Sequence, residues 1–290
     1  MATPPPYLKR NLNFVSVMIA LLLGAAIAQQ ATPPVDPAGT ETGMVRFVNL
    51  SPNATPVTFA LSNADGVVVT MAAEEALAYG AQSDYYEVPA GEYEMTVSVG
   101  DASSQLPPGF TAPYLVVAPN DLGVADDSYQ TVVVMGLLVP ETFDDVDDES
   151  GFVGWLRDLF GGDTPADRDA LGLRVEVLDD DLGAEFGAGE GRVRVVHAAP
   201  GATAVDLVSL GDAGVVAGDV AFGQVSGFHT LEADDLSLAV RATGSDAELA
   251  NLSTQSLGAG SSHTIFLIGT PFEGVPLEAK VLTSAPLATQ

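Results

Sequence analysis

The fold is decided by two matching stretches, Met44-Val-Arg-Phe-Val-Asn-Leu-Ser-Pro52 and Arg192-Val-Arg-Val-Val-His-Ala-Ala-Pro200. In both, apolar and polar residues alternate near the start, as in a β-strand that buries one face. Further matches follow in the same order. They are Tyr79-Gly80 with Phe222-Gly223, and Thr131-Val-Val-Val-Met-Gly136 with Thr264-Ile-Phe-Leu-Ile-Gly269. A repeat on this scale predicts that one β-rich module occurs twice.

The spacing between matching residues shows where the first copy is longer. It falls from 133 residues between Thr131 and Thr264 to 104 residues between Leu173 and Leu277. The first copy therefore carries 29 extra residues after Gly136. An insertion of this length is the one large segment without a counterpart in the second copy.

Turn signals and strand composition predict the fold class. Segments rich in Val, Thr, Phe, Tyr and Ile are broken every 8 to 12 residues or so by Gly, Pro, Asn and Asp, the signal for an all-β sandwich. The stretch from Glu92 to Val99 alternates cleanly and predicts a half-solvated antiparallel strand. In the repeated first strand we expect Val45, Phe47 and Leu50 in the core, and Arg192 and Arg194 pointing outward.

The N-terminus has the pattern of a secretory signal peptide. Lys9 and Arg10 precede an apolar run from Phe14, and Ala26-Ile-Ala28 offers a small-residue cleavage site. The run is shorter than the roughly 20 residues that cross a bilayer, so we favour cleavage near Ala28 over a retained anchor. The sequence then predicts five segments in order: a signal peptide over 1–28, a Pro-rich spacer over 29–43, a β-sandwich domain over 44–178, an acidic Gly-rich linker over 179–191 and a second β-sandwich domain over 192–285.

The pattern resembles a family of exported bacterial and archaeal proteins, the domain of unknown function 4397. The resemblance rests on Arg192 to Pro200, on Ala204-Val-Asp206, on Val220-Ala-Phe-Gly223 and on the strand from Thr264 to Gly269. It implies two tandem immunoglobulin-like or transthyretin-like antiparallel β-sandwich domains. It implies no reaction, cofactor or catalytic residue.

The charge is strongly acidic. The formal net charge is −29, with 39 acidic against 10 basic residues, and removing Lys9 and Arg10 leaves −31. Such a surface repels phosphate backbones and anionic membranes, so nucleic-acid binding is disfavoured. A solvated acidic surface is our preferred interpretation, and cation binding is the alternative. The sequence contains no cysteine, which rules out disulfides and a lipid-anchored lipoprotein.

Catalytic motifs are missing from the sequence. It has no G-x-S-x-G elbow, no Walker loop and no thiol. The three histidines, His197, His229 and His263, have no metal-ligand spacing. His197 could pair with Asp206, but we favour a side chain satisfied by local hydrogen bonds, because the first copy has Asn49 in its place. We therefore expect no catalytic, cofactor-binding or firm metal site.

The insertion over 141–170 predicts a short helix. Ser150 can cap it, Gly161 can end it, and apolar residues lie at helical spacing between them. A helix of some 11 residues needs a surface to cover its apolar side, which is either its own sandwich or a partner or membrane interface. The candidate docking residues are Phe152, Trp155, Leu156 and Phe160.

The acidic residues before this helix suggest a weak calcium site. Asp145, Asp147 and Glu149 alternate as ligands do, but Leu156 stands where an EF-hand loop has its bidentate Glu. Loose Ca²⁺ association is the most that this pattern supports, and we expect no other cofactor.

Together these features predict a secreted or cell-surface protein with a structural or binding role in adhesion or the envelope. The expected partner is a protein or glycan of the cell envelope, with membrane contact only through the helix over 151–160. The alternative is an extracellular hydrolase or metal-dependent enzyme with a site assembled from loops. A pocket holding His197, Asp206 and another titratable group would favour that alternative.

Overall fold

The computed structural model describes residues 41–100, 114–117, 122–138, 171–180, 182, 186–210, 214–232, 238–252, 258–271 and 275–284. Residues 39–290 belong to one compact unit. The predicted signal peptide, nearly all of the spacer and the predicted helical insertion lie outside the described residues. No helix among the described residues is long and apolar enough to cross a membrane.

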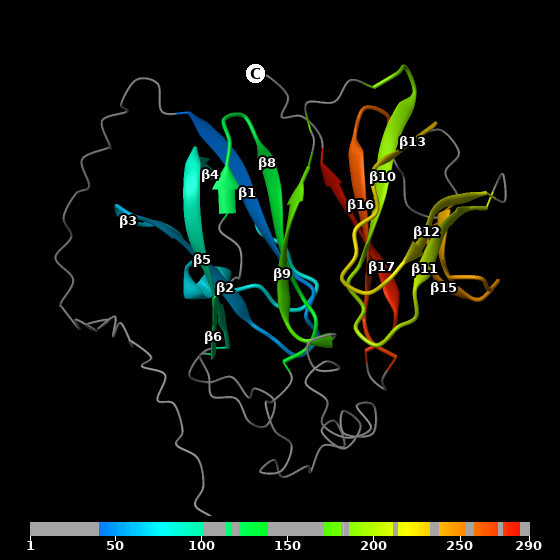
Figure 1. The fold of residues 1–290 in the computed structure, drawn as a ribbon, viewed down its shortest axis with the longest axis horizontal. Helices are drawn as coiled ribbons and strands as arrows, with labels where there is room; N and C mark the ends of the chain where they lie inside the picture. The colour runs from blue at the N-terminus through cyan, green and yellow to red at the C-terminus, as the bar shows by residue number, and fades with distance from the viewer. Residues whose placement is uncertain are drawn as a thin grey trace, which may run out of the picture. The chain divides into compact units, whose positions relative to one another are not determined.

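The first module is a sandwich of two sheets (Figure 1). One sheet has the order β4-β1-β8-β9, and the other has the order β3-β2-β5-β6 with β7 also paired to β5. A short 3₁₀ helix, η1, lies between β3 and β4. The elements are β1 (Thr42–Asn49), β2 (Val57–Asn63), β3 (Gly66–Thr70), η1 (Ala73–Glu75), β4 (Tyr86–Pro89), β5 (Gly91–Val99), β6 (Tyr114–Val117), β7 (Leu122–Val124), β8 (Tyr129–Met135) and β9 (Arg174–Asp179).

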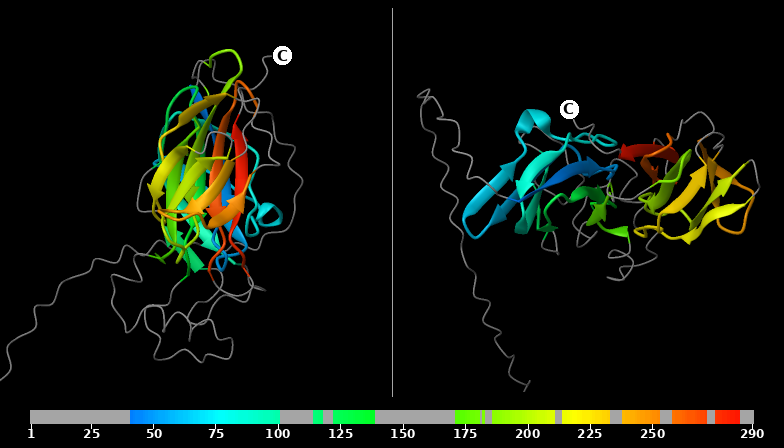
Figure 2. Two further views of the ribbon diagram at one scale, coloured as in Figure 1. Left: turned by 90° about the vertical axis from the view of Figure 1, so that its right-hand side faces the viewer. Right: turned by 90° about the horizontal axis from the view of Figure 1, so that it is seen from above.

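The second module repeats this arrangement with sheets β13-β10-β16-β17 and β12-β11-β14-β15. The two sheets of each module face each other as two layers (Figure 2). The strands are β10 (Glu190–His197), β11 (Val205–Ser209), β12 (Val215–Val220), β13 (His229–Glu232), β14 (Leu238–Ala242), β15 (Glu248–Asn251), β16 (Ser262–Ile268) and β17 (Glu278–Ser284). The prediction of an all-β fold with two sandwich modules is confirmed.

The expectation of purely antiparallel sheets is wrong at one strand pair in each module. β1 pairs with β8 in parallel, and β10 pairs with β16 in parallel. A parallel pair needs a long crossover, and here the chain passes through the whole opposite sheet between the two strands. The remaining strand pairs in the described residues are antiparallel.

The repeat also fixes a glycine at the end of β8 and of β16. Gly136 and Gly269 have φ values of 90° and 98°, a left-handed region that favours glycine. A Cβ atom at Gly136 would clash with the carbonyl oxygen of Gly172, and one at Gly269 would clash with that of Pro276. Close backbone approach therefore explains why both copies of this strand end in glycine.

Each sandwich has its own apolar core. In the first module, Phe47 and Phe59 stack with ring centroids 4.4 Å apart. Strand β5 buries Tyr93, Met95, Val97 and Val99, as its alternation predicted. In the second module Val195 and Leu207 take the places of Phe47 and Phe59 and lie fully buried.

A third core joins the two modules. Its buried residues come from the outward faces of the sheets that contain β1 and β10. Leu50, which we expected inside the first sandwich, belongs to this third core. The buried set is Val48, Leu50, Val133, Met135 and Leu178 of the first module with Val196, Ala198, Phe266, Ile268 and Leu282 of the second. The boundaries of the two folding domains stay a prediction, but contact between the modules is apolar and extensive.

Candidate functional site

Asp180 lies buried between the two modules, with a side chain only 1% exposed. It accepts a hydrogen bond from Nη2 of Arg46 and one from Nη2 of Arg194, each at 3.2 Å. The hydroxyls of Thr131 and Tyr85 donate to the same carboxylate at 2.7 and 2.6 Å. We call these five residues the interface ion cluster. The sequence analysis assigned Asp180 to the acidic Gly-rich linker and gave no sign that this carboxylate is buried.

The two arginines of the cluster occupy matching positions in the repeat. Arg46 donates from Nε to Thr131 at 2.8 Å, and Arg194 donates from Nε to Thr264 at 2.9 Å. Arg46 lies over the ring of Tyr85 at 4.6 Å, and Arg194 lies over that of Phe228 at 4.5 Å. Arg194 points outward from its own sandwich, as expected, but there it enters the contact between the modules and is buried.

Burial changes the acidity of the cluster. Burial lowers the pKa of Arg194, although the carboxylate of Asp180 acts in the opposite direction. Burial, followed by the charge of Asp180, raises the pKa of Tyr85. These shifts keep the phenol a neutral hydrogen-bond donor at physiological pH. The polar groups of the cluster hydrogen-bond to one another and are shielded from solvent. The cluster therefore helps to fix the orientation of one module against the other.

The buried histidines are engaged in local hydrogen bonds. His197 is fully buried, with Nε2 2.9 Å from the carbonyl oxygen of Thr203 and Nδ1 3.3 Å from the backbone nitrogen of Ala199. Asp206 accepts instead from the backbone of Asp219 and the hydroxyl of Thr243, each at 2.8 Å. His197 thus makes local hydrogen bonds to nearby backbone groups and is not paired with Asp206. Burial lowers the pKa of His197, which favours the neutral ring that these contacts require.

His263 has similar surroundings. Its ring nitrogens lie 3.1 Å from the hydroxyls of Ser261 and Thr283, and burial lowers its pKa. Within the described residues, no group of three or more His, Asp and Glu side chains is arranged to hold a metal ion.

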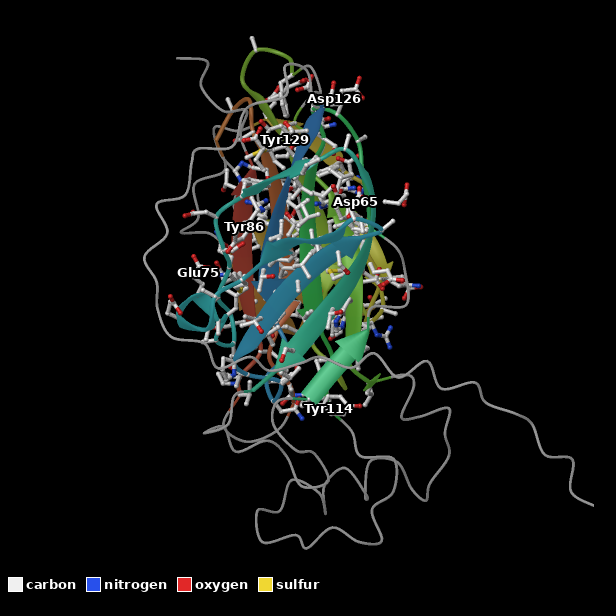
Figure 3. The ribbon with its side chains drawn as sticks, turned by 90° about the vertical axis from the view of Figure 1, so that its left-hand side faces the viewer. Asp65, Glu75, Tyr86, Tyr114, Asp126 and Tyr129 are labelled. Atoms are coloured by element: carbon white, nitrogen blue, oxygen red, sulfur yellow. The ribbon has the colours of Figure 1, made fainter. Side chains whose placement is uncertain are left out.

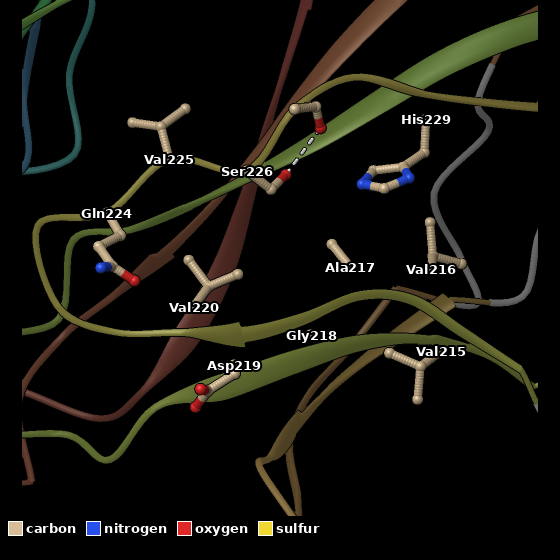
Figure 4. A pocket seen from close by; sticks show the side chains of 11 residues that line it. Val215, Val216, Ala217, Gly218, Asp219, Val220, Gln224, Val225, Ser226 and His229 are labelled. Carbon is tan, nitrogen blue, oxygen red and sulfur yellow. Dashed lines mark hydrogen bonds between the residues drawn. The ribbon is translucent and has the colours of Figure 1, made fainter.

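An open groove of about 630 Å³ runs along one side of the second module. Strand β12 forms one wall, and the segment from Gln224 to His229 forms the other (Figure 4). Val215 and Val225 are 62% and 38% exposed on these walls. Asp219 is exposed and has a φ value of 57°. This groove is our candidate binding site.

The first module has larger side chains at the matching positions. Val193 is the β10 partner of His229, and Val45 is the β1 partner of Tyr86, so Tyr86 matches His229. The ring of Tyr86 lies 5.7 Å from that of Phe47. Burial, followed by the charge of Glu75 in η1, raises the pKa of Tyr86. Both residues are labelled in Figure 3.

Two further differences open the groove in the second module. Met71 is 3% exposed and donates its backbone NH to the carbonyl oxygen of Phe59. In the second module Leu207 matches Phe59, and its strand partner is Ala217. Ala217 therefore stands where the first module has Met71. Between Met71 and Leu77 the first module inserts the turn that contains η1, whereas the second has only Gly218 and Asp219 before Val220. A shorter turn and smaller side chains therefore leave space beside β12.

The groove was missed from the sequence, although a signal for it exists. The spacing of the repeat falls from 148 residues at Val45 and Val193 to 143 at Tyr79 and Phe222. Three of those five residues fall in the turn between Met71 and Leu77, and the other two fall between Phe59 and Met71. The predicted calcium and docking residues lie outside the described residues: Asp145, Asp147, Glu149, Phe152, Trp155, Leu156 and Phe160.

Comparison with protein families places the chain. The model of the domain of unknown function (DUF4397) matches residues 43–150 and 173–289, so each match corresponds to one module. The chain belongs to this family. The two matches confirm the tandem arrangement that the repeated motifs indicated. No curated protein matches the sequence.

Solved structures give weak similarities. A candidate cell adhesion protein from Bacteroides uniformis is 10% identical, with 82% of this chain and 97% of that chain covered and a TM-score of 0.19. One from Parabacteroides distasonis is 9% identical, with coverage of 83% and 99% and a TM-score of 0.21. The fimbrial anchor protein Mfa2 from Porphyromonas gingivalis is 10% identical, with coverage of 84% and 98% and a TM-score of 0.19. Similarities of this size carry no argument about this chain.

Proposed function

We propose that this protein is a non-catalytic structural and binding protein of the cell envelope or cell exterior. In this proposal the two modules act as one unit that presents a binding surface. The observation that carries it is the contact between the modules, where an apolar core and the interface ion cluster bury residues of both. A fixed relative orientation suits a protein that displays a site, because less flexibility is lost when a partner binds.

The use of the polar side chains supports a role without catalysis. An active site needs a nucleophile, base or metal whose contacts are open to a substrate. Here His197 and His263 are buried and hydrogen-bonded to neighbouring backbone and hydroxyl groups. Asp180 is bound by two arginines of the fold.

The sequence supports the location. The signal-peptide pattern over 1–28 supports export of the chain. The strongly acidic composition favours solubility outside the cell and disfavours nucleic acid as a partner. The finer assignment of each sandwich to an immunoglobulin-like or transthyretin-like class is part of this proposal.

The test combines location and turnover. We expect the full chain, expressed in its source cells, to be recovered from the envelope or medium with Gln29 as its first residue, as N-terminal sequencing would show. We expect the purified protein to leave chromogenic esters, phosphoesters, glycosides and peptides unchanged, with and without Zn²⁺, Mg²⁺ or Ca²⁺. Recovery in the cytoplasm with Met1 retained would contradict the location. Turnover that disappears in His197→Asn or His229→Tyr would contradict the non-catalytic role.

A further inference from the structure

We propose that the groove beside β12 binds an extended, positively charged peptide segment of a partner protein. This inference deepens the proposed binding role and rests on it. It assigns the site to one module, names the chemistry of the partner and explains why the two copies of the module differ at this place.

The first step is the comparison between the modules, which identifies what kind of group fits the groove. In the first module the matching segment is longer, with the turn from Ala72 to Ala76 where the second module has Gly218 and Asp219. Met71 and Tyr86 pack on the first core where the second module has Ala217 and His229. Glu75 of this turn bonds back to the amide of Ala72 at 3.0 Å. The second module has a shorter turn and keeps the walls. A short peptide segment supplied by another molecule can therefore take the place of the missing residues.

The second step concerns the walls of the groove, which suit an extended segment. β12 is the edge strand of its sheet in the described part of the chain. An edge strand presents backbone NH and CO groups to which another strand can add. Val215 and Val225, on opposite walls, expose apolar surface on which alternate side chains of an added strand can pack. Backbone pairing and apolar anchors together favour a peptide over a compact small molecule.

The third step is charge complementarity. The residues that line the groove include Asp219 and no Lys or Arg. Asp206 lies next to Asp219 and accepts a hydrogen bond from its backbone NH. The whole chain carries a formal charge of −29, so a second copy of the chain is repelled and a basic segment is attracted. The partner segment therefore carries Lys or Arg beside small apolar residues.

The test uses capped synthetic peptides and the full mature chain in 0.15 M NaCl. The probe is acetyl-Gly-Val-Lys-Val-Arg-Val-Gly-amide. One control peptide has Glu in place of Lys and Arg, and another keeps the charges but has Pro in place of two Val residues, which removes backbone donors. Binding is measured by calorimetry, and the site is mapped by amide shifts of Gly218 and Gly227 in NMR spectra.

Three variants separate the groove from general charge attraction. Asp219→Asn removes the groove charge, and Asn is tolerated at a positive φ, so the backbone is preserved. Asp65→Asn is its matched control, because Asp65 is exposed on the first module and the change in net charge is the same. His229→Tyr places in the groove the ring that the first module has at Tyr86.

We expect the basic peptide to bind at least ten-fold more tightly than either control peptide. Asp219→Asn should weaken it roughly two- to five-fold, as for an exposed ion pair, and Asp65→Asn should leave it unchanged. His229→Tyr should weaken it at least ten-fold with an unchanged melting temperature. Equal effects of Asp65→Asn and Asp219→Asn, equal binding of the proline peptide, or peptide-independent dimerisation through β12 would each overturn the inference. None of these results alters the location or turnover tests, so failure here is distinguishable from failure of the proposed function.

Discussion

Removal of the Asp180 carboxylate is the sharpest test of the contact between the modules. Asp180→Ala leaves the guanidinium groups of Arg46 and Arg194 buried without their shared anion, since both side chains are only 5% to 6% exposed. Thr131 and Tyr85 lose an acceptor as well. Breaking a buried ion pair by removing one partner typically costs about 3 to 5 kcal/mol. We therefore expect unfolding of the mature chain to become easier by about this amount.

The assay is thermal and urea unfolding of the mature protein. For a chain of this size the expected loss lowers the melting temperature by roughly 6 to 20 °C, at about 2 to 4 °C per kcal/mol. The matched control is Asp246→Ala, because Asp246 is fully exposed and lies 3.7 Å from the Arg241 guanidinium. Exposed pairs contribute little, so the control should melt as the parent does.

A second substitution set separates charge burial from simple packing loss. Changing Asp180 to Leu together with Arg46 and Arg194 to Met replaces the ionic groups by apolar ones. Such replacements are often neutral or stabilising, so this triple variant should recover most of the loss. The account is refuted if Asp180→Ala melts no earlier than Asp246→Ala. It is also refuted if 1 M NaCl restores the stability of Asp180→Ala to that of the parent, because buried charges are screened much less than exposed ones.

Three further predictions concern the whole chain. NaCl should raise the melting temperature of the mature protein by screening its excess negative charge, and equal ionic strength of CaCl₂ separates screening from specific binding; an unchanged melting temperature in NaCl contradicts the repulsion account. Burial holds the pKa of His197 below its unfolded value of about 6.5, so stability should fall as the pH drops below about 6.5. His197→Asn, which copies Asn49, should reduce that loss in urea titrations at pH 7 and pH 5; an equal loss in parent and variant contradicts this role. Trp155 should give blue-shifted fluorescence in dilute protein if the predicted helix packs on its own sandwich, whereas a shift only on adding lipid or envelope extract indicates docking.

Local patterns in the sequence were sufficient for the strands. Alternation predicted the buried face of β5, and the repeated motif of β1 and β10 indicated that two modules share one fold. Alternation predicts which side chains point away from the core of a sandwich, but it does not predict what covers the outer face of the sheet. Arg194 was therefore expected to point outward, but nothing in the strand pattern indicated that the contact between the modules buries it together with Arg46. Asp180 looked like one more linker acid for the same reason.

The parallel strand pairs and the groove depend on contacts between distant segments. Neither β1 nor β8 carries a local sign that they lie side by side, because the pairing is decided by the path of the chain through the other sheet. The groove depends on three separate differences between the copies, at Ala217, at the shortened turn and at His229. Only a residue-by-residue superposition of the two modules brings these differences to one place.

The two copies agree where the backbone must be held and differ where the groove opens. Ser83 accepts from the amide of Phe47 at 2.9 Å, and Ser226 accepts from that of Val195 at the same distance. Even where Asn49 is replaced by His197, both side chains bond to nearby backbone groups. Such hydrogen bonds maintain the sandwich whatever the module binds. Both modules have an edge strand with exposed valines here, Val67 and Val68 on β3 and Val215 on β12. The second module differs in its shorter turn and in Ala217 and His229, and these differences contribute nothing to the hydrogen bonds that maintain the sandwich. A binding role for the second module is the physical account that explains why this side stays open while the rest of the fold is kept.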